Sequence, residues 1–261
     1  MKVKISYILA VCIVYGLLPL TMNAQEPEKP YQLFWVHDAF VKPSMKTEYF
    51  EAGKKWIALL TKHQVPFPVN TYWTDDNHVM WTIPIESFAD IDKLYASTMK
   101  IEETAPDEFK SIRAAYAGTS YSSRICVYAL DYEYSMIAED AATKSEGNNF
   151  TFFDIYYFEP YKETELYEIF DEMKALVKDK EILQSWYFYW GVMGTDNPVL
   201  WSAASAKNAT AFYEENAKAW EILGQEASKI RQKLMKYVTK QERKTAWFQK
   251  ELSYVPAKKE E

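Results

Sequence analysis

The chain contains an internal duplication, and this feature constrains its fold more than any other. Four short segments recur in the same order in the second half, with offsets that grow only from 117 to 120 and 122 residues. They are Val41-Lys42-Pro43 with Phe158-Glu159-Pro160, Thr71-Tyr72-Trp73 with Phe188-Tyr189-Trp190, Val79-Met80-Trp81 with Val199-Leu200-Trp201, and Ala129-Leu130-Asp131-Tyr132 with Glu251-Leu252-Ser253-Tyr254. Such a repeat predicts one compact body built from two similar halves.

Each copy has the order strand, helix, strand, strand, helix, strand. In the first copy we expect these elements at 33–40, 44–62, 69–74, 79–85, 88–116 and 123–132. In the second copy we expect them at 150–158, 163–178, 185–192, 199–204, 210–238 and 246–254. The charge run from Lys229 to Lys244 indicates a solvated helix face. The order is that of the ferredoxin-like βαββαβ unit, in which helices cover one face of an antiparallel sheet.

The first strand is apolar on both faces. Its alternating sets are Leu33, Trp35, Ala39 and Val41 on one side and Phe34, Val36 and Phe40 on the other. A sheet that is buried on both sides needs a second sheet as well as its helices. We therefore predict an α+β fold in which repeats 31–134 and 150–256 place their antiparallel sheets face to face as a pseudo-dimeric α/β barrel. The polar segment 135–149 is the expected linker.

In element order and aromatic pattern, the chain from Tyr31 to Pro256 resembles a tandem, fused member of the dimeric α/β-barrel superfamily. This superfamily includes EthD-like, NIPSNAP-like and antibiotic-monooxygenase-like proteins. No signature residue assigns a subfamily. The resemblance implies a cavity between the sheets, which the superfamily uses for cofactor-free oxidation, haem chemistry, isomerisation or binding alone, and a fold does not choose among these.

The N-terminus predicts export. Lys2 and Lys4 precede an apolar run from Ile5 to Leu20 and the small residue Ala24, as in a secretory signal peptide cleaved near Ala24, so we expect 1–24 to be removed and the protein to be periplasmic or extracellular. No later stretch is long and apolar enough to span a bilayer. With 37 acidic against 30 basic residues, nucleic acid is not an expected partner. The last five residues, 257–261, form a charged tail.

The strongest candidate for chemistry is the pair His37 and Asp154, which are equivalent in the two copies. If both face the cavity, the carboxylate would orient the imidazole and raise its pKa, as general-base catalysis requires. The competing interpretation is a structural polar pair. Trp35, His37, Tyr72, Asp154 and Tyr189 are the predicted ligand-binding residues, because tyrosine hydroxyls and tryptophan rings can bind and stack on flat molecules. Such rings are equally well explained as core.

The remaining candidates have plain structural explanations. His63 stands near a helix end, where a cation is favourable, although haem-using members of the superfamily bind iron through a histidine. His78 follows the acidic turn Asp75-Asp76-Asn77 and could contact a metal together with the two aspartates, but exposed hairpin turns are normally acidic and solvated. Cys126 is expected to be a small core residue. We therefore predict no metal site and no cofactor, with haem as the alternative.

Two functions follow from these observations. The first is a secreted protein that binds a small, flat, apolar or aromatic molecule between its sheets without catalysis. The second is a cofactor-free or haem-dependent oxygenase or isomerase of the barrel type. The scarcity of polar residues on the strands favours the first.

Overall fold

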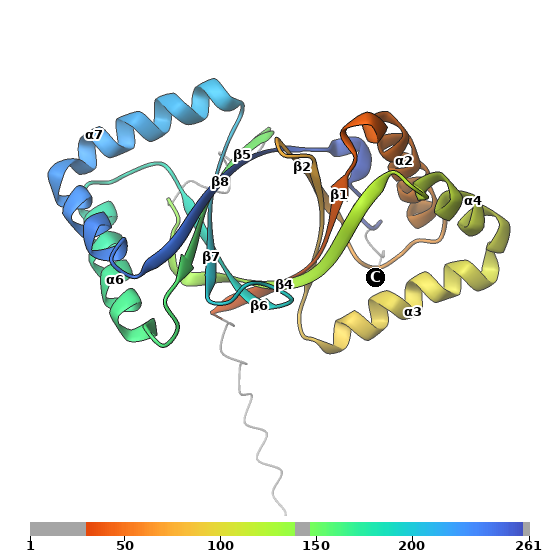
Figure 1. The fold of residues 1–261 in the computed structure, drawn as a ribbon, viewed down its shortest axis with the longest axis horizontal. Helices are drawn as coiled ribbons and strands as arrows, with labels where there is room; N and C mark the ends of the chain where they lie inside the picture. Colours follow the sequence, from red (N-terminus) through yellow and green to blue (C-terminus); the bar gives the residue numbers. More distant parts are fainter. Residues whose placement is uncertain (1–29, 139–146, 258–261) are drawn as a thin grey trace, which may run out of the picture.

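The eight strands of the protein form one closed antiparallel barrel (Figure 1). The computed structural model describes residues 30–138 and 147–257, so the predicted signal peptide 1–24, the middle of the predicted linker 135–149 and most of the tail 257–261 lie outside the described residues. The strands follow one another around the barrel in the order β1-β3-β2-β8-β5-β7-β6-β4. The predicted α+β barrel of two ferredoxin-like repeats is confirmed.

Each half has the order strand, helix, strand, strand, helix, strand, with the second helical region of the first half divided in two. The first half comprises β1 Tyr31–Val41, α2 Lys46–Lys62, β2 Asn70–Thr74, β3 His78–Ile85, α3 Ala89–Thr104, α4 Pro106–Tyr116 and β4 Ser120–Met136. The second half comprises β5 Phe150–Phe158, α6 Glu163–Asp179, β6 Trp186–Met193, β7 Val199–Ala206, α7 Ala209–Leu234 and β8 Val238–Phe248. The division between α3 and α4 falls at Pro106, which lacks the N–H that a continuous helix needs.

The two sheets join along both of their edges. Strands β4, β1, β3 and β2 form the first sheet, and β8, β5, β7 and β6 form the second. The edge strand β2 pairs with β8, and β4 pairs with β6, so neither sheet keeps an open edge. Helices α2, α3 and α4 cover the outside of the first sheet, and α6 and α7 cover the second (Figure 1).

One element differs from the sequence prediction. The final strand is β8 at Val238–Phe248, whereas we expected helix as far as 238 and a strand at 246–254. The prediction of a solvated helix face at 229–244 is therefore wrong from Val238 onward. The polar residues of this segment are tolerated in a strand because β8 pairs along its length with β5. Two of them, Glu242 and Lys244, lie in a charged end of the barrel.

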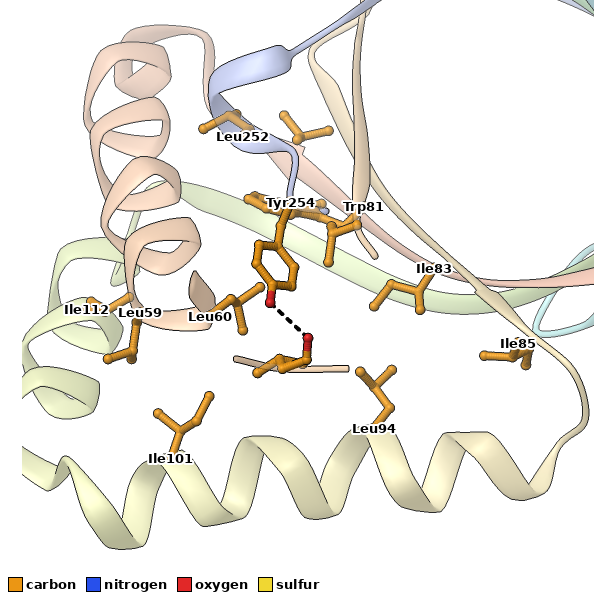
Figure 2. Packing of buried hydrophobic residues seen from close by; sticks show 14 of the residues in the cluster. Leu59, Leu60, Trp81, Ile83, Ile85, Leu94, Ile101, Ile112, Leu252 and Tyr254 are labelled. Carbon is orange, nitrogen blue, oxygen red and sulfur yellow. Dashed lines mark hydrogen bonds between the residues drawn. The ribbon is translucent and has the colours of Figure 1, made fainter. Parts of the chain in front are cut away.

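Two hydrophobic cores lie outside the barrel, between each sheet and its helices. The first contains Leu59, Leu60, Ile83, Ile101 and Ile112 (Figure 2). Trp81 also lies in this core and donates a 2.9 Å hydrogen bond from Nε1 to the Tyr49 hydroxyl. A third cluster fills the barrel interior and includes Val36, Tyr128, Ile155 and Trp201. Trp81 and Trp201 therefore point to opposite sides of their sheets, although the sequence match treats them as equivalent.

Candidate ligand-binding cavity

A cavity of about 880 Å³ occupies the barrel interior and extends to one end of the barrel. Side chains from both sheets line it, among them Phe34, Tyr72, Tyr128, Phe153, Tyr189 and Trp201. They point inward because alternate residues of a strand face opposite sides, and on β1 the inward set is Phe34, Val36 and Asp38. The volume is in the range of pockets that hold small organic molecules.

Aromatic contacts across the barrel fix the shape of the cavity walls. The rings of Phe34 on β1 and Tyr189 on β6 meet edge to face, with centroids 5.8 Å apart. Trp201 on β7 makes similar contacts with Tyr128 at 5.5 Å and with Phe153 at 5.2 Å. Edge-to-face packing is a favourable arrangement for aromatic rings, so these rings stabilise one another and make the walls largely apolar.

Several polar groups of the wall are unpaired. The hydroxyls of Tyr72 and Tyr189 have no hydrogen-bond partner among the described residues, and burial raises the pKa of both. Both phenols are therefore protonated at neutral pH and are free to donate to a ligand. Gln184, which precedes β6, also lines the cavity, and both polar atoms of its buried amide lack a partner in the described part of the chain.

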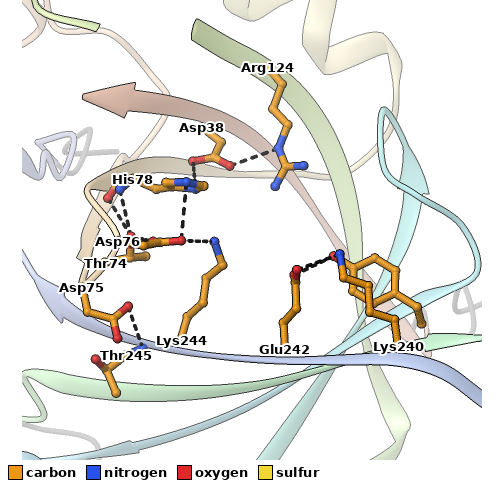
Figure 3. Close-up of polar contacts among 11 residues, drawn as sticks. Asp38, Thr74, Asp75, Asp76, His78, Arg124, Lys240, Glu242, Lys244 and Thr245 are labelled. Atoms are coloured by element: carbon orange, nitrogen blue, oxygen red, sulfur yellow. Dashed lines mark hydrogen bonds and ion pairs between the residues drawn. The ribbon is translucent and has the colours of Figure 1, made fainter. Parts of the chain in front are cut away.

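The opposite end of the barrel holds a charged cluster (Figure 3). Asp38 is 2 % exposed; its carboxylate accepts a 3.0 Å hydrogen bond from Arg124 Nε and lies 3.4 Å from His78 Nδ1. The other ring nitrogen of His78 lies 3.5 Å from Asp76, which also binds Lys244. Burial alone would raise the pKa of Asp76, but the hydrogen bonds from Lys244 and Thr74 hold it below its usual value.

Of the predicted ligand-binding residues, Tyr72 and Tyr189 line the cavity and the other three do not. Trp35 and His37 lie on the outer face of β1, where their rings are 6.3 Å apart and Trp35 packs against the first helix-covered core. Asp154 lies on the outer face of β5 and accepts hydrogen bonds from Tyr156 and Gln241. The expectation that His37 and Asp154 meet in the cavity is therefore wrong. The repeat correctly made them equivalent, but the sequence did not show which side of the strand faces inward.

The other histidines and the cysteine occupy structural positions. His63 is the C-cap of α2, as its position in the sequence indicated. His78 lies inside the barrel with its side chain 12 % exposed, whereas Asp75 and Asp76 of the turn before it are exposed, as expected. Cys126 is buried in the interior cluster, where burial raises the pKa of its thiol. Within residues 30–138 and 147–257, no group of three or more potential metal ligands comes together.

A second cavity, of about 740 Å³, lies between the outer face of the second sheet and helices α6 and α7. Asp154, Tyr156, Arg231 and Arg243 contribute to its lining. Neither this cavity nor the one inside the barrel is lined by a histidine or a cysteine. A haem held by a histidine, as the superfamily resemblance allowed, therefore does not fit either cavity.

Sequence reasoning missed Gln184, Asp38 and Arg124. The sequence did contain a signal for Asp38, because an aspartate inside an apolar strand needs a buried partner. The neighbouring strand β4 provides Arg124 directly opposite it. Gln184 gives no signal in the sequence, since it stands in a connection between α6 and β6.

None of the described helices has the length and apolar character needed to cross a membrane.

Comparisons with solved structures identify the architecture. An anthrone oxidase-like protein matches with a TM-score of 0.55 and 13% identity, over 85% of this chain and 92% of its own. A candidate monooxygenase from Lactobacillus acidophilus NCFM matches with a TM-score of 0.51 and 8% identity, over 86% of this chain and 96% of its own. No family model and no curated protein sequence matches the chain. The protein therefore has the fold of the dimeric α/β-barrel superfamily, with both units in one polypeptide.

Proposed function

We propose that the protein binds a small, flat, apolar molecule inside its barrel without catalysing a reaction on it. The observation that carries this proposal is the cavity of about 880 Å³ whose walls are edge-to-face aromatic rings from both sheets. A flat ligand can stack against such walls, and the free hydroxyls of Tyr72 and Tyr189 can bind its polar substituents.

The character of the polar groups supports binding over catalysis. Tyr72 and Tyr189 on the cavity wall have raised pKa values, which keep their hydroxyls protonated. They are therefore poor general bases at neutral pH. The buried carboxylate of Asp38 is bound to Arg124 at the other end of the barrel. We further propose, from the N-terminal sequence, that the protein acts in the periplasm or outside the cell.

The experiment is a fluorescence titration of the purified protein with polycyclic aromatic hydrocarbons, comparing two substitutions at one site. Ala203 is buried and lines the cavity from β7. Ala203→Phe fills part of the cavity and should weaken binding about tenfold or more, whereas Ala203→Ser keeps the volume and should retain it. If Ala203→Phe folds and binds as the wild type does, the ligand lies elsewhere and the proposal is wrong.

The alternative is cofactor-free oxygenation in the same cavity. Its support is the names given to the two matching structures, a candidate monooxygenase and an anthrone oxidase-like protein. Oxygen uptake with anthrone as the substrate would distinguish the two functions. Uptake that depends on the protein and disappears in Ala203→Phe would favour oxygenation, and its absence despite ligand binding would favour the binding function.

A further inference from the structure

The cavity of about 740 Å³ between the second sheet and its helices is elongated. Its lining follows most of the length of α7, from Phe212 near the start of the helix to Arg231 in the last turn. At a rise of 1.5 Å per residue these two positions are roughly 28 Å apart along a straight helix. The helix bends at Gly224, where the backbone is not helical, and both of its parts contribute to the lining. The cavity thus runs along α7.

Most of this lining is apolar. It includes Phe170 and Val177 of α6, Leu200 of β7, and Trp220 and Leu223 of α7. The same residues belong to the hydrophobic core of the second half or pack against it, so the cavity is a gap within this core. Water gains few hydrogen bonds in such surroundings, and an apolar chain is a more favourable occupant.

The carboxylate of Asp154 on the sheet side of the cavity is satisfied within the protein. Its Oδ2 accepts a 2.8 Å hydrogen bond from the Tyr156 hydroxyl, and its Oδ1 accepts one from Gln241. Arg243 Nε lies 3.5 Å from the same Oδ1. Asp154 therefore has three partners without Arg231.

Arg231 is a half-buried cation of the lining and has no acidic partner among the residues that the structure describes. Burial and the Asp154 carboxylate raise the pKa of Tyr156, while a hydrogen bond from Arg231 opposes this shift, so the guanidinium reaches from α7 to the sheet. A guanidinium has five N–H donors. After the bond to Tyr156, Arg231 can still bind a carboxylate through two parallel hydrogen bonds.

We infer that this cavity is a second ligand site, which holds a long-chain carboxylate with its acyl chain along α7 and its carboxylate on Arg231. The length and apolar lining of the cavity suit the chain, and Arg231 fixes the position of the head group. This site goes beyond the function proposed for the barrel interior. The second sheet separates the two cavities, since the neighbouring residues Ser202 and Ala203 of β7 line different ones.

The test is a calorimetric titration with three probes that share a twelve-carbon chain: laurate, 1-dodecanol and dodecyltrimethylammonium. In the wild type, laurate should bind about tenfold more tightly than 1-dodecanol, and the cation should bind most weakly, because the carboxylate alone forms charged hydrogen bonds with Arg231. In Arg231→Gln the ratio between laurate and 1-dodecanol should fall to about one. Lys229→Gln is the matched control, because it removes an exposed charge of α7 that does not line the cavity, and it should keep the ratio.

Two substitutions on β7 show which cavity the chain occupies. Ser202→Phe fills part of the cavity outside the barrel and should weaken laurate binding about tenfold or more. Ala203→Phe fills part of the barrel interior and should leave laurate binding unchanged. Circular dichroism checks that each variant is folded. If Ser202→Phe does not fold, Arg231→Gln decides the question, because it leaves the core intact.

Several results would overturn the second site. Laurate does not bind the wild type, dodecyltrimethylammonium binds as tightly as laurate, or the preference for laurate over 1-dodecanol survives in Arg231→Gln. An equal loss of this preference in Lys229→Gln would show an effect of net charge, and loss of laurate binding in Ala203→Phe but not in Ser202→Phe would place the chain in the barrel. The function proposed for the barrel is tested separately, by the titration with polycyclic hydrocarbons.

Discussion

Asp38 on β1 and Arg124 on β4 form an ion pair inside the barrel, with Arg124 Nε 3.0 Å from Asp38 Oδ2. The two residues are direct neighbours across the antiparallel pairing of their strands. The Asp38 side chain is only 3 % exposed, while that of Arg124 is 37 % exposed. The carboxylate thus depends on Arg124 and His78 for its stabilisation, and this dependence can be measured.

Replacing Arg124 by Leu should destabilise the protein by about 3 kcal/mol, because it leaves a buried carboxylate without its main partner. Urea denaturation measures the change. In the double variant Asp38→Leu/Arg124→Leu much of the loss should be recovered, since no buried charge then remains unpaired. Lys62→Ala is the control: it removes an ion pair to Glu108 that is more than half exposed on both sides, and should change stability by less than about 1 kcal/mol. Equal losses in Arg124→Leu and Lys62→Ala would contradict the prediction.

His37 should make the protein less stable as the pH falls. Burial lowers the pKa of His37 below its ordinary value of 6.5, although the nearby charge of Asp38 opposes this shift. At a pH between the pKa of His37 in the folded protein and its pKa in the unfolded chain, the unfolded chain binds more protons. The stability that comes from the neutral, buried imidazole is therefore complete above the unfolded pKa and is lost as the pH falls through the folded pKa. His37→Gln should reduce the slope of unfolding free energy between about pH 7 and pH 5. An unchanged slope in this variant would show that His37 is not responsible.

The repeat in the sequence was sufficient to predict the barrel but not the direction of its side chains. Tyr72 and Tyr189 are equivalent in the repeat and do line the cavity, but His37 and Asp154 are equivalent as well and face outward, so equivalence alone does not give the direction of a side chain. On β1 both alternating sets are apolar, so hydrophobicity could not distinguish the set of Trp35 and His37 from the set of Phe34 and Val36. The distinction comes from long-range packing, in which β1 pairs with both β3 and β4 while its outer face contacts the helices.

The misplaced final strand has a different physical cause. The sequence of β8 is rich in lysine, arginine, glutamine and glutamate, and charged residues with helical propensity continue the pattern of α7. Tertiary pairing overrides that propensity, since β8 is held between β5 and β2. The segment 251–254, which we matched to 129–132, instead begins in a short 3-10 helix and crosses to the core of the first half.

Two glycines with left-handed backbones should respond differently to the same substitution. Gly118 has φ +78 and open space where a Cβ would lie, so Gly118→Ala should cost about 1 kcal/mol from the backbone conformation alone. Gly194 has φ +70, and a Cβ there would overlap the backbone carbonyl oxygen of Ile125. Gly194→Ala should therefore cost about 3 kcal/mol, because the clash adds to the conformational strain. Chemical denaturation measures both, and equal losses would contradict the role of the clash.

The C-terminal segment completes the core of the first half. Leu252 is fully buried there, and the Tyr254 hydroxyl donates a 2.9 Å hydrogen bond to the Val65 carbonyl (Figure 2). The buried hydroxyl of Thr71 on β2 donates to the Leu252 carbonyl, so the segment is tied to the first sheet through its backbone as well.

Leu252→Ala should destabilise the protein by about 3 kcal/mol, since it leaves a cavity in the core between the first half and the C-terminal segment. Val255→Ala, three residues on, is the matched control, because Val255 is 79% exposed and its truncation should change stability by less than about 0.5 kcal/mol. Hydrogen exchange of the α2 and β2 amides would locate the effect: faster exchange in Leu252→Ala should appear in the first half, which the segment joins, before it appears in α6 and α7. If α6 and α7 are the first to lose protection, the segment does not stabilise the first half as the packing of Leu252 indicates.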